Sequence, residues 1–283
     1  MSKIIYKQLN EVAKYRNDRI SIELLTENSY ISTENMIQDR GGVTVATSIP
    51  ENNTVSKFDK SDILLSNIRP YFKKIWHANI IGGCSNDVLV VKPKKNINPR
   101  FLYYVLSDSN FFNYATVTSK GTKMPRGSKQ AIMKYLVPDF ELPVQTRIAD
   151  ILSTYDKLIE NNNRRIELLE KAAQELYKEW FVRFRFPNHE NTKFVNGLPE
   201  GWSAFRLEDV AEIGRGSSPR PIADQKYFVD GKIPWIKIAD ATASKMFIFK
   251  TKEYVNDYGA SFSRKLAPGS LILAASGTLG FPM

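Results

Sequence analysis

The stretch LPVQTRIADILSTYDKLIENNNRRIELLEKAAQELYKEWF (142–181) decides how this chain is built. From Ile148 to Trp180, apolar side chains recur at steps that alternate between four and three residues, with one polar member, Asn162. This is the heptad pattern of a coiled coil, and a helix of this length would extend about 50 Å. The residues of the seam are Ile148, Leu152, Tyr155, Ile159, Asn162, Ile166, Leu169, Ala173, Leu176 and Trp180.

The predicted helix needs a surface to cover its seam, because most of its other positions carry charged or amide side chains. A seam sustained over several heptads favours a partner helix. The alternative is that the seam packs onto its own globular domain. Asn162 would fix the register of a helix pair, or it would mark a solvated kink at 161–163.

The segments on either side of the helix read as mixed α and β structure. Short apolar or β-branched runs bounded by Gly, Pro, Asn or Asp predict strands at 43–47, 62–68 and 86–93, and helical spacing predicts a helix over 99–115. After the helix, 187–200 has the composition of a linker, and we predict strands at 232–240, 246–251 and 270–276. The fold class is therefore α+β, with domains at 1–144 and 201–283 and the long helix at 145–186.

The two flanking domains repeat one another weakly. KQLNEVAK (7–14) aligns with FRLEDVAE (205–212), SYISTENM (29–36) with PWIKIADA (234–241), and FDKSDILLS (58–66) with LAPGSLILA (266–274). The three pairs of similar segments occur in the same order and at a nearly constant separation in the sequence, which indicates an internal repeat. Because the chain stops soon after the last of these segments, we expect the second domain to be truncated and its matching helix to be absent.

The order of these parts resembles the specificity subunit of type I restriction–modification enzymes. The resemblance is carried by the helix-entry segment LPVQTRIADILSTYDKLIENNNRRIELLEKAAQELYKEWF (142–181) and by GLPEGWSAFRLEDVAEIGRG (197–216), and it covers nearly the whole chain. It implies target-recognition domains that each read half of a split DNA site, held apart by antiparallel spacer helices. It also implies docking of methyltransferase subunits and translocase–nuclease (restriction) subunits. Those partners would use S-adenosylmethionine, ATP and Mg, whereas this chain would need no cofactor.

A net charge of +10 independently favours a polyanionic partner such as double-stranded DNA. Three segments combine basic residues with glycine, proline or aromatic neighbours: TSKGTKMPRGSKQ (118–130), SNIRPYFKKIW (66–76) and GRGSSPRP (214–221). Lys and Arg would contact phosphates, and loop side chains would reach base edges. The DNA-binding candidates are Lys120, Lys123, Arg126, Lys129, Arg69, Tyr71, Lys73, Lys74, Arg215 and Arg220. KPKKNINPR (92–100) reads as a solvated connection.

Motifs for chemistry are missing from the sequence. It has no phosphate-binding GxxxxGK[ST] loop and no HExxH, and its two histidines and single cysteine do not suit a zinc site or a Ser/His/Asp triad. PDFELP (138–143) lacks the lysine that would complete a nuclease motif. Cys84 is expected to be a small buried side chain rather than a nucleophile. We predict a non-catalytic subunit without a metal.

The start of the chain lacks the apolar core of a signal peptide, and no apolar run approaches the roughly 20 residues that span a bilayer. A cytoplasmic protein without membrane contact is expected. The alternatives to a DNA-recognition subunit are a coiled-coil adaptor without DNA specificity, a silent truncated specificity subunit, and a stand-alone nucleic-acid enzyme. Two copies could also pair through their long helices around a twofold axis.

Overall fold

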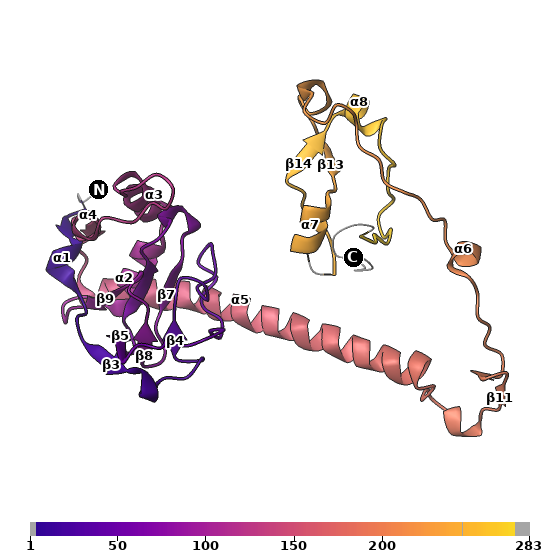
Figure 1. Ribbon diagram of the computed structural model, residues 1–283, viewed down its shortest axis with the longest axis horizontal. Helices are drawn as coiled ribbons and strands as arrows, with labels where there is room; N and C mark the ends of the chain where they lie inside the picture. The colour runs from indigo at the N-terminus through magenta and orange to yellow at the C-terminus, as the bar shows by residue number, and fades with distance from the viewer. Residues whose placement is uncertain (1–3, 245, 275–283) are drawn as a thin grey trace. The chain divides into compact units, whose positions relative to one another are not determined.

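The computed structural model describes residues 4–244 and 246–274. The chain divides into two compact units, Met1–Arg183 and Phe184–Met283. The first unit holds a mixed α/β domain and the long helix (Figure 1). The second unit is smaller and mostly irregular.

The first unit contains two four-stranded sheets. One has the strand order β2-β9-β6-β7 and is antiparallel throughout; the other has the order β3-β5-β8-β4, in which only the β4–β8 pair is parallel. The strands of the first sheet are β2 (Ala13–Tyr15), β9 (Val88–Pro93), β6 (Ile63–Ser66) and β7 (Ile75–His77). Those of the second are β3 (Arg19–Ser21), β5 (Thr54–Phe58), β8 (Gly82–Cys84) and β4 (Tyr30–Ile31).

Strands β6 and β9 are continuous apolar runs because both of their faces are buried. Successive side chains of a strand point to opposite faces. On one face Ile63, Leu65 and Val91 join the main core with the helices, and on the other Leu64 and Val90 join a second core with residues of the other sheet. The first sheet is therefore the middle of three layers.

The helical layer consists of short helices: α1 (Leu9–Val12), α2 (Pro99–Ser107), α3 (Ser109–Val117) and α4 (Lys129–Ile132). Side chains cap the N-termini of α2, α3 and α4. Two 3-10 turns, η1 (Ile22–Leu24) and η2 (Pro70–Phe72), lie in the connections of the strands. The single helix predicted over 99–115 is wrong in one respect: it is interrupted at Asp108. The Asp108 carboxylate accepts a hydrogen bond from the amide of Asn110 and starts a new helix there.

The strand predicted at 43–47 does not form. Val43 makes an isolated bridge to Met36, and the rest of the segment is irregular. The buried side chain of Asn35 donates hydrogen bonds to the carbonyls of Tyr30 and Thr44, at 3.0 and 2.9 Å. A side-chain amide thus satisfies backbone groups that a neighbouring strand would otherwise bond. The strands predicted at 62–68 and 86–93 are confirmed as β6 and β9.

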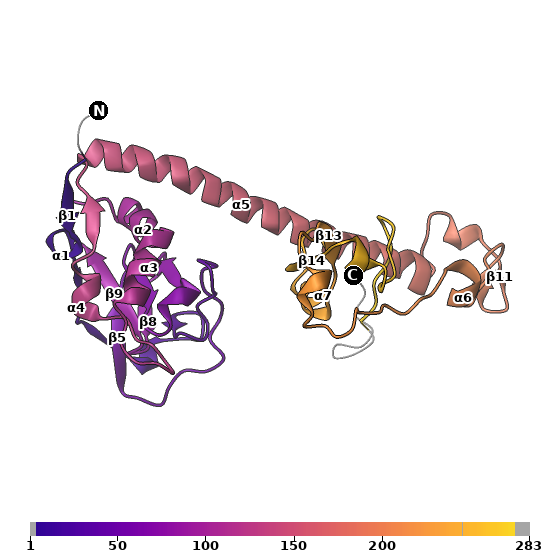
Figure 2. The ribbon, with the colours of Figure 1, turned by 90° about the horizontal axis from the view of Figure 1, so that it is seen from above.

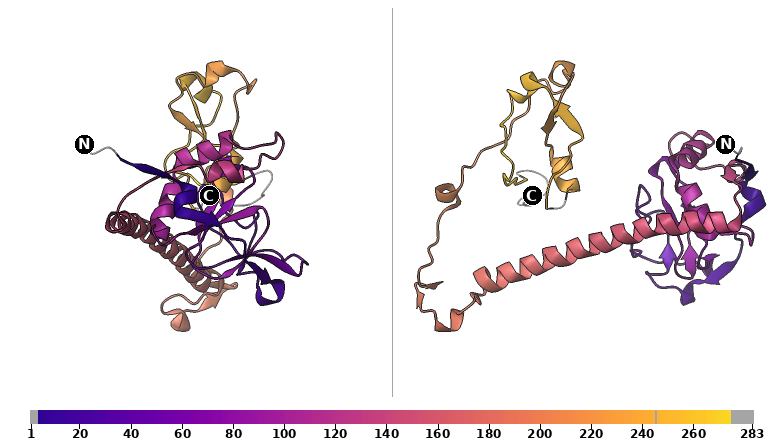
Figure 3. Two further views of the ribbon diagram at one scale, coloured as in Figure 1. Left: turned by 90° about the vertical axis from the view of Figure 1, so that its left-hand side faces the viewer. Right: turned by 180° about the vertical axis from the view of Figure 1, so that it is seen from behind.

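The long helix predicted from the heptad pattern is confirmed. Helix α5 (Leu142–Tyr177) continues into one π-helical turn (Lys178–Val182), and the helix runs without interruption through 161–163 (Figures 1 and 3). It follows directly on a two-stranded ribbon of β1 (Tyr6–Gln8) and β10 (Leu136–Pro138), as Figure 2 shows. Its length is about 55 Å at 1.5 Å per residue.

Only the first turns of α5 pack against the domain. Gln145, Ala149 and Ser153 are buried, and their spacing of four residues marks a single inward stripe. The amide of Gln145 bonds both to the carbonyl of Phe140 and to the backbone N–H of Asn98, each at 2.8 Å. Tyr104 donates a hydrogen bond of 2.6 Å to Asp156. Beyond this attachment the helix extends away from the domain.

The second unit is built from short elements. They are η4 (His189–Asn191), β11 (Phe194–Val195), β12 (Leu198–Pro199), α6 (Leu207–Val210), η5 (Gln225–Tyr227), β13 (Ile233–Trp235), α7 (Ile238–Ala243), β14 (Glu253–Val255) and α8 (Asp257–Ala260). Trp235, Val255 and Ala260 form a small core. The segment predicted as a linker contains the β11–β12 hairpin, and the Phe186 and Trp202 rings that flank the hairpin stack at 5.1 Å between centroids.

The strand predictions for the second unit are partly wrong. Over 232–240 the strand ends at Trp235, because the Asp240 carboxylate accepts from the amide of Lys237 at 3.0 Å and starts a helix. The predicted strand at 246–251 is irregular, and β14 forms just after it. Ser270–Ala274 forms no strand, and the last two residues of that prediction, with the final segment of the chain, lie outside the described residues.

One part of the internal repeat is visible in the structure. The aligned segments 7–14 and 205–212 each form a four-residue helix, α1 and α6, at matching positions. In both, an acidic side chain accepts from the backbone N–H three residues earlier: Glu11 from Gln8 at 2.6 Å, and Asp209 from Arg206 at 3.1 Å. The shared local geometry supports the repeat at this point.

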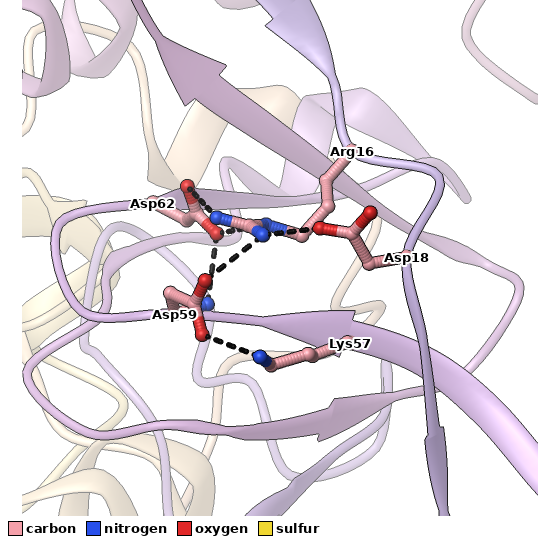
Figure 4. Close-up of polar contacts among 5 residues, drawn as sticks. All are labelled: Arg16, Asp18, Lys57, Asp59 and Asp62. Carbon is pink, nitrogen blue, oxygen red and sulfur yellow. Dashed lines mark hydrogen bonds and ion pairs between the residues drawn. The ribbon is translucent and has the colours of Figure 1, made fainter.

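A buried ion cluster joins the two sheets of the first unit (Figure 4). Arg16 follows β2, and its guanidinium contacts Asp62 at 2.6 Å, Asp59 at 2.9 Å and Asp18 at 2.5 Å. The side chains of Arg16 and Asp62 are only 5% and 3% exposed, whereas Asp18 is 60% exposed. Burial lowers the pKa of Arg16, but the hydrogen bonds and charges of Asp62, Asp18 and Asp59 together outweigh it and raise that pKa overall.

Replacing Asp62 by Asn should destabilise the domain by about 3 kcal/mol, because it removes the only one of the three carboxylates around the buried Arg16 guanidinium that is itself fully buried. The matched change Asp18→Asn removes an exposed partner of the same arginine and should cost less than about 1 kcal/mol. Urea unfolding followed by circular dichroism measures both. Equal losses for the two variants would contradict this account of the cluster.

Cys84 is fully buried, as the sequence predicted, and burial raises the pKa of its thiol to about 12. At pH 8 the thiol therefore stays protonated, whereas an exposed cysteine is partly thiolate. A disulfide reagent should modify Cys84 only at the rate of unfolding in native buffer, and rapidly in urea. Rapid modification of the folded chain would show that the β8 strand opens readily.

Candidate nucleic-acid interface

Two of the basic segments that the sequence singled out separately lie side by side in the first unit. The backbone N–H of Arg69 donates to the carbonyl of Pro125 at 2.8 Å, and the N–H of Gly127 donates to the carbonyl of Asn67 at 2.9 Å. Ile68 and Arg126 form an isolated bridge between the same segments. Residues 66–76 and 118–130 therefore form one surface, which we call the basic surface.

The first segment of the basic surface turns sharply after β6. Residues Arg69 and Lys73, on either side of η2, have positive φ angles of 50° and 51°. A non-glycine residue in this region costs on the order of 1 kcal/mol or more and persists only when its surroundings hold it. Tyr71 lies within the turn with 47% of its surface exposed, and its ring meets Phe72 edge-on at 4.7 Å. The turn thus presents an aromatic side chain between two basic residues.

The second segment carries exposed lysines that face no acid. Lys120, Lys123 and Lys129 are all exposed, and none of them has a carboxylate partner within ion-pair distance among the residues that the structure describes. Lys120 and Arg126 exchange two backbone hydrogen bonds of 2.9 Å, which close the loop between them. Such uncompensated charges are suited to phosphate oxygens.

A close contact fixes how the two segments meet. A Cβ atom on Gly127 would lie 3.0 Å from the amide oxygen of Asn67 and 3.1 Å from Ile132. Glycine at this position lets the basic loop lie directly on the turn. Asn67 is 8% exposed, and its side-chain oxygen has no hydrogen-bond partner among the described residues.

Two predicted DNA contacts have partners inside the domain. Lys74 donates a hydrogen bond of 2.6 Å to the carbonyl of Thr33, and burial lowers the pKa of its ammonium group. Arg126 forms an ion pair of 3.1 Å with Asp87 and remains 57% exposed. Lys74 therefore has a structural partner, whereas Arg126 can still reach a ligand. The assignment of either to DNA stays a prediction.

The third basic segment belongs to the second unit. Arg215 and Arg220 are exposed on an irregular loop. The loop is tied to its own unit by Ser217, which donates to the carbonyl of Phe262 at 2.7 Å, and by Tyr227, which donates to the carbonyl of Arg220 at 2.8 Å. The roles of both arginines also stay predictions.

Sequence reasoning missed two residues that contact the basic surface, Asp87 and Arg40. Asp87 is the ion-pair partner of Arg126. Arg40 lies in the sequence QDRGG (38–42), whose paired glycines are typical of a turn but do not indicate which segments lie beside it. The contacts of both residues come from segments distant in sequence, so no local pattern marks them.

The heptad seam of α5 forms a second candidate surface. From Leu152 onward its large aliphatic and tyrosine side chains are exposed: Leu152, Tyr155, Ile159, Ile166, Leu169 and Leu176. Ile148 packs against the domain core, and Trp180 is half-buried in the π-helical turn. Exposed fractions of 62% for Tyr155 and 68% for Leu169 leave much apolar area uncovered. Val144, Ile151 and Leu158 add apolar side chains beside the seam that the sequence reasoning did not include.

Within residues 4–244 and 246–274, no three His, Cys, Asp or Glu side chains are grouped to hold a metal ion. No helix in that part of the chain is both long and apolar enough to cross a membrane.

The first unit thus combines an α/β domain that carries an exposed basic surface with a long helix whose apolar seam is uncovered. The profile of the type I restriction modification DNA specificity domain matches residues 1–171. The chain therefore belongs to the family of type I restriction–modification specificity subunits.

Individual relatives agree with this assignment. The MjaIX specificity subunit of Methanocaldococcus jannaschii is 30% identical over 171 residues, covering 58% of this chain and 38% of that protein. The MjaVIII specificity subunit of the same organism is 26% identical over 259 residues, covering 87% of this chain and 56% of that protein. The chain thus spans about half the length, or less, of these curated relatives.

A solved structure shows the same fold. The type I restriction-modification system S subunit from M. genitalium aligns with a TM-score of 0.51 at 13% identity, covering 90% of this chain and 62% of that one. The mixed α/β domain followed by a long helix is common to both, as the sequence predicted.

Proposed function

We propose that this chain reads part of a split DNA target through the basic surface of its first unit. The observation that carries the proposal is the junction of residues 66–76 and 118–130, which gathers uncompensated lysines, an exposed tyrosine and glycine-rich backbone in one place. The family assignment supports DNA as the polyanion. Phosphate contacts by the lysines would set position, and Tyr71 and Arg126 would contact base edges.

We further propose that the exposed seam of α5 docks protein partners. Type I methyltransferase subunits, and through them restriction subunits, are the partners that family membership suggests. Methyl transfer from S-adenosylmethionine and ATP- and Mg-dependent cleavage would belong to those subunits, so this chain would perform no chemistry itself. A helix of about 55 Å can separate recognition modules by more than one turn of B-DNA, which is roughly 34–36 Å.

Binding to a random-sequence DNA duplex tests the basic surface. The double variant Lys120→Gln, Lys123→Gln should lower affinity and reduce the slope of log K against log salt by about 2, since each phosphate contact contributes about 0.9. The matched variant Lys60→Gln, Lys95→Gln removes the same charge from exposed positions outside the surface and should leave the slope nearly unchanged. Fluorescence anisotropy over a salt series gives both values.

Equal slopes for the two double variants would mean that net charge alone attracts DNA. No salt-dependent binding by the wild-type chain would favour a protein adaptor and contradict the proposed DNA recognition.

The seam also predicts self-association, because two copies can cover each other's exposed apolar stripe. Leu169→Asp should abolish it by burying a charge in the pairing surface. Leu168→Asp is a matched control, since Leu168 is 48% exposed but turned about 100° away from the seam. Sedimentation equilibrium at micromolar concentrations measures the change. A wild-type chain that remains monomeric would contradict self-association. The seam would then be left to bind a different protein.

A further inference from the structure

The loop 37–42 lies between the basic surface and the helical layer, and neither the sequence motifs nor the proposed contacts account for it. Its residues Asp39 and Arg40 both have positive φ angles, 52° and 66°. Two consecutive non-glycine residues in this region are uncommon and indicate that neighbouring groups impose the conformation. The neighbours that do so are the turn of the basic surface and the junction of α2 with α3.

On one side the loop bonds to the turn that carries Tyr71. The N–H of Asp39 donates to the carbonyl of Phe72 at 2.9 Å, and the N–H of Arg40 donates to the carbonyl of Lys73 at 3.0 Å. These two bonds attach the far end of the turn, where Lys73 has its own positive φ. The near end is attached by the bond between Arg69 and Pro125.

On the other side the Arg40 side chain reaches the α2–α3 junction. Its Nε donates to the carbonyl of Ser107, and one terminal nitrogen donates to the hydroxyl of Ser109 at 3.0 Å. The guanidinium also lies over the ring of Phe112, 5.6 Å from its centroid, and Phe112 is 3% exposed. Two nitrogens of the guanidinium are therefore engaged inside the protein, and the ring face beneath them is fixed in the core.

Arg40 thereby links both segments of the basic surface. Its backbone holds the turn 69–73, and its side chain holds the start of α3 (Ser109–Val117), which leads directly into 118–130. This link adds to the direct backbone bonds between the two segments and connects the far end of the Tyr71 turn, which those bonds do not reach, to the start of α3. Because base reading requires several side chains to meet one duplex in a fixed arrangement, a shift between the two segments would reduce specific binding more than phosphate attraction.

We propose that Arg40 is a positioning residue that holds the two halves of the basic surface in register for sequence-specific DNA binding. This inference rests on the proposed function of that surface. Arg40 acts through the turn and α3, and its engaged nitrogens distinguish it from the exposed lysines that face solvent. Lysine retains the charge but lacks the planar fork that bonds Ser107 and Ser109 together, so it should not replace arginine here.

The test compares Arg40→Lys and Arg40→Gln with Arg19→Lys. Arg19 is a matched control because its guanidinium also bonds a backbone carbonyl and a hydroxyl, both of Thr54, and makes neither bond with the basic surface. Hydrogen exchange of the free protein is the first readout. In both Arg40 variants we expect exchange to be about tenfold faster in 37–42, 69–73 and 125–127, the order expected for one or two lost hydrogen bonds, with β6 unchanged.

DNA binding is the second readout, and it uses two duplexes of the same length. One is a sequence that the wild-type chain enriches from a random library, and the other is a scrambled version of that sequence. Both Arg40 variants should bind the enriched duplex about tenfold or more weakly, with unchanged affinity for the scrambled duplex and an unchanged salt slope. Arg19→Lys should match the wild type in both readouts.

Three outcomes overturn the inference. In the first, Arg40→Lys binds DNA like the wild type, and Arg40→Gln shows a salt slope lowered by about one. Those results together would make Arg40 a phosphate contact. Faster exchange without any change in the preference between the two duplexes would make it a purely structural residue. Failure of the wild-type chain to enrich any duplex would instead remove the proposed function on which the inference rests, and the exchange data would still report whether the link exists.

Discussion

Burial of both faces of the β2-β9-β6-β7 sheet is the constraint on which the rest of the first unit depends. Ile63, Leu64 and Leu65 are each at most 3% exposed, so the strand cannot shift by one residue without exchanging its two cores. The turn 66–76 begins where β6 ends, and α2 follows β9 through a short connection. A rigid middle layer therefore fixes the starting points of the segments that form the basic surface.

The sequence predicted what local periodicity determines. The α5 seam needs only its own spacing to be recognised, and the buried strands β6 and β9 are continuous apolar runs, so these predictions were correct. The strand predicted at 43–47 failed because the buried Asn35 side chain bonds backbone groups there, and a side chain in another segment leaves no trace in the local pattern. The helix predicted over 99–115 is split by the cap at Asp108. The bulky residues on both sides keep helical spacing, so their pattern did not indicate the cap.

For the candidate site, too, the sequence predicted local features and missed contacts between distant segments. Basic and glycine-rich runs can be recognised from the sequence alone. Composition identified the segment with Lys120 and Lys123 and the segment with Tyr71 as separate candidates. Their junction rests on backbone bonds between Asn67, Arg69, Pro125 and Gly127, which join residues more than fifty positions apart. Arg40 and Asp87 were missed for the same reason. Conversely, Lys74 looked like its neighbours in the sequence, but its ammonium group bonds Thr33.

The two candidate surfaces of the first unit have opposite chemistry. The basic surface combines a hydrogen-bonded backbone with exposed lysine side chains and is suited to a polyanion, whereas the α5 seam is apolar and is suited to another helix. Both lie on one continuous stretch of chain, with the ribbon β1–β10 and the start of α5 packed against the same core.

The central claim is that residues 66–76 and 118–130 contact duplex DNA together. Photo-crosslinking of the 283-residue chain to a duplex carrying photoreactive bases, followed by peptide mapping, tests this directly. The account predicts that crosslinks concentrate in both segments, with Tyr71 among the modified residues. Crosslinks spread over 92–100 and α5, with neither loop enriched, would contradict it.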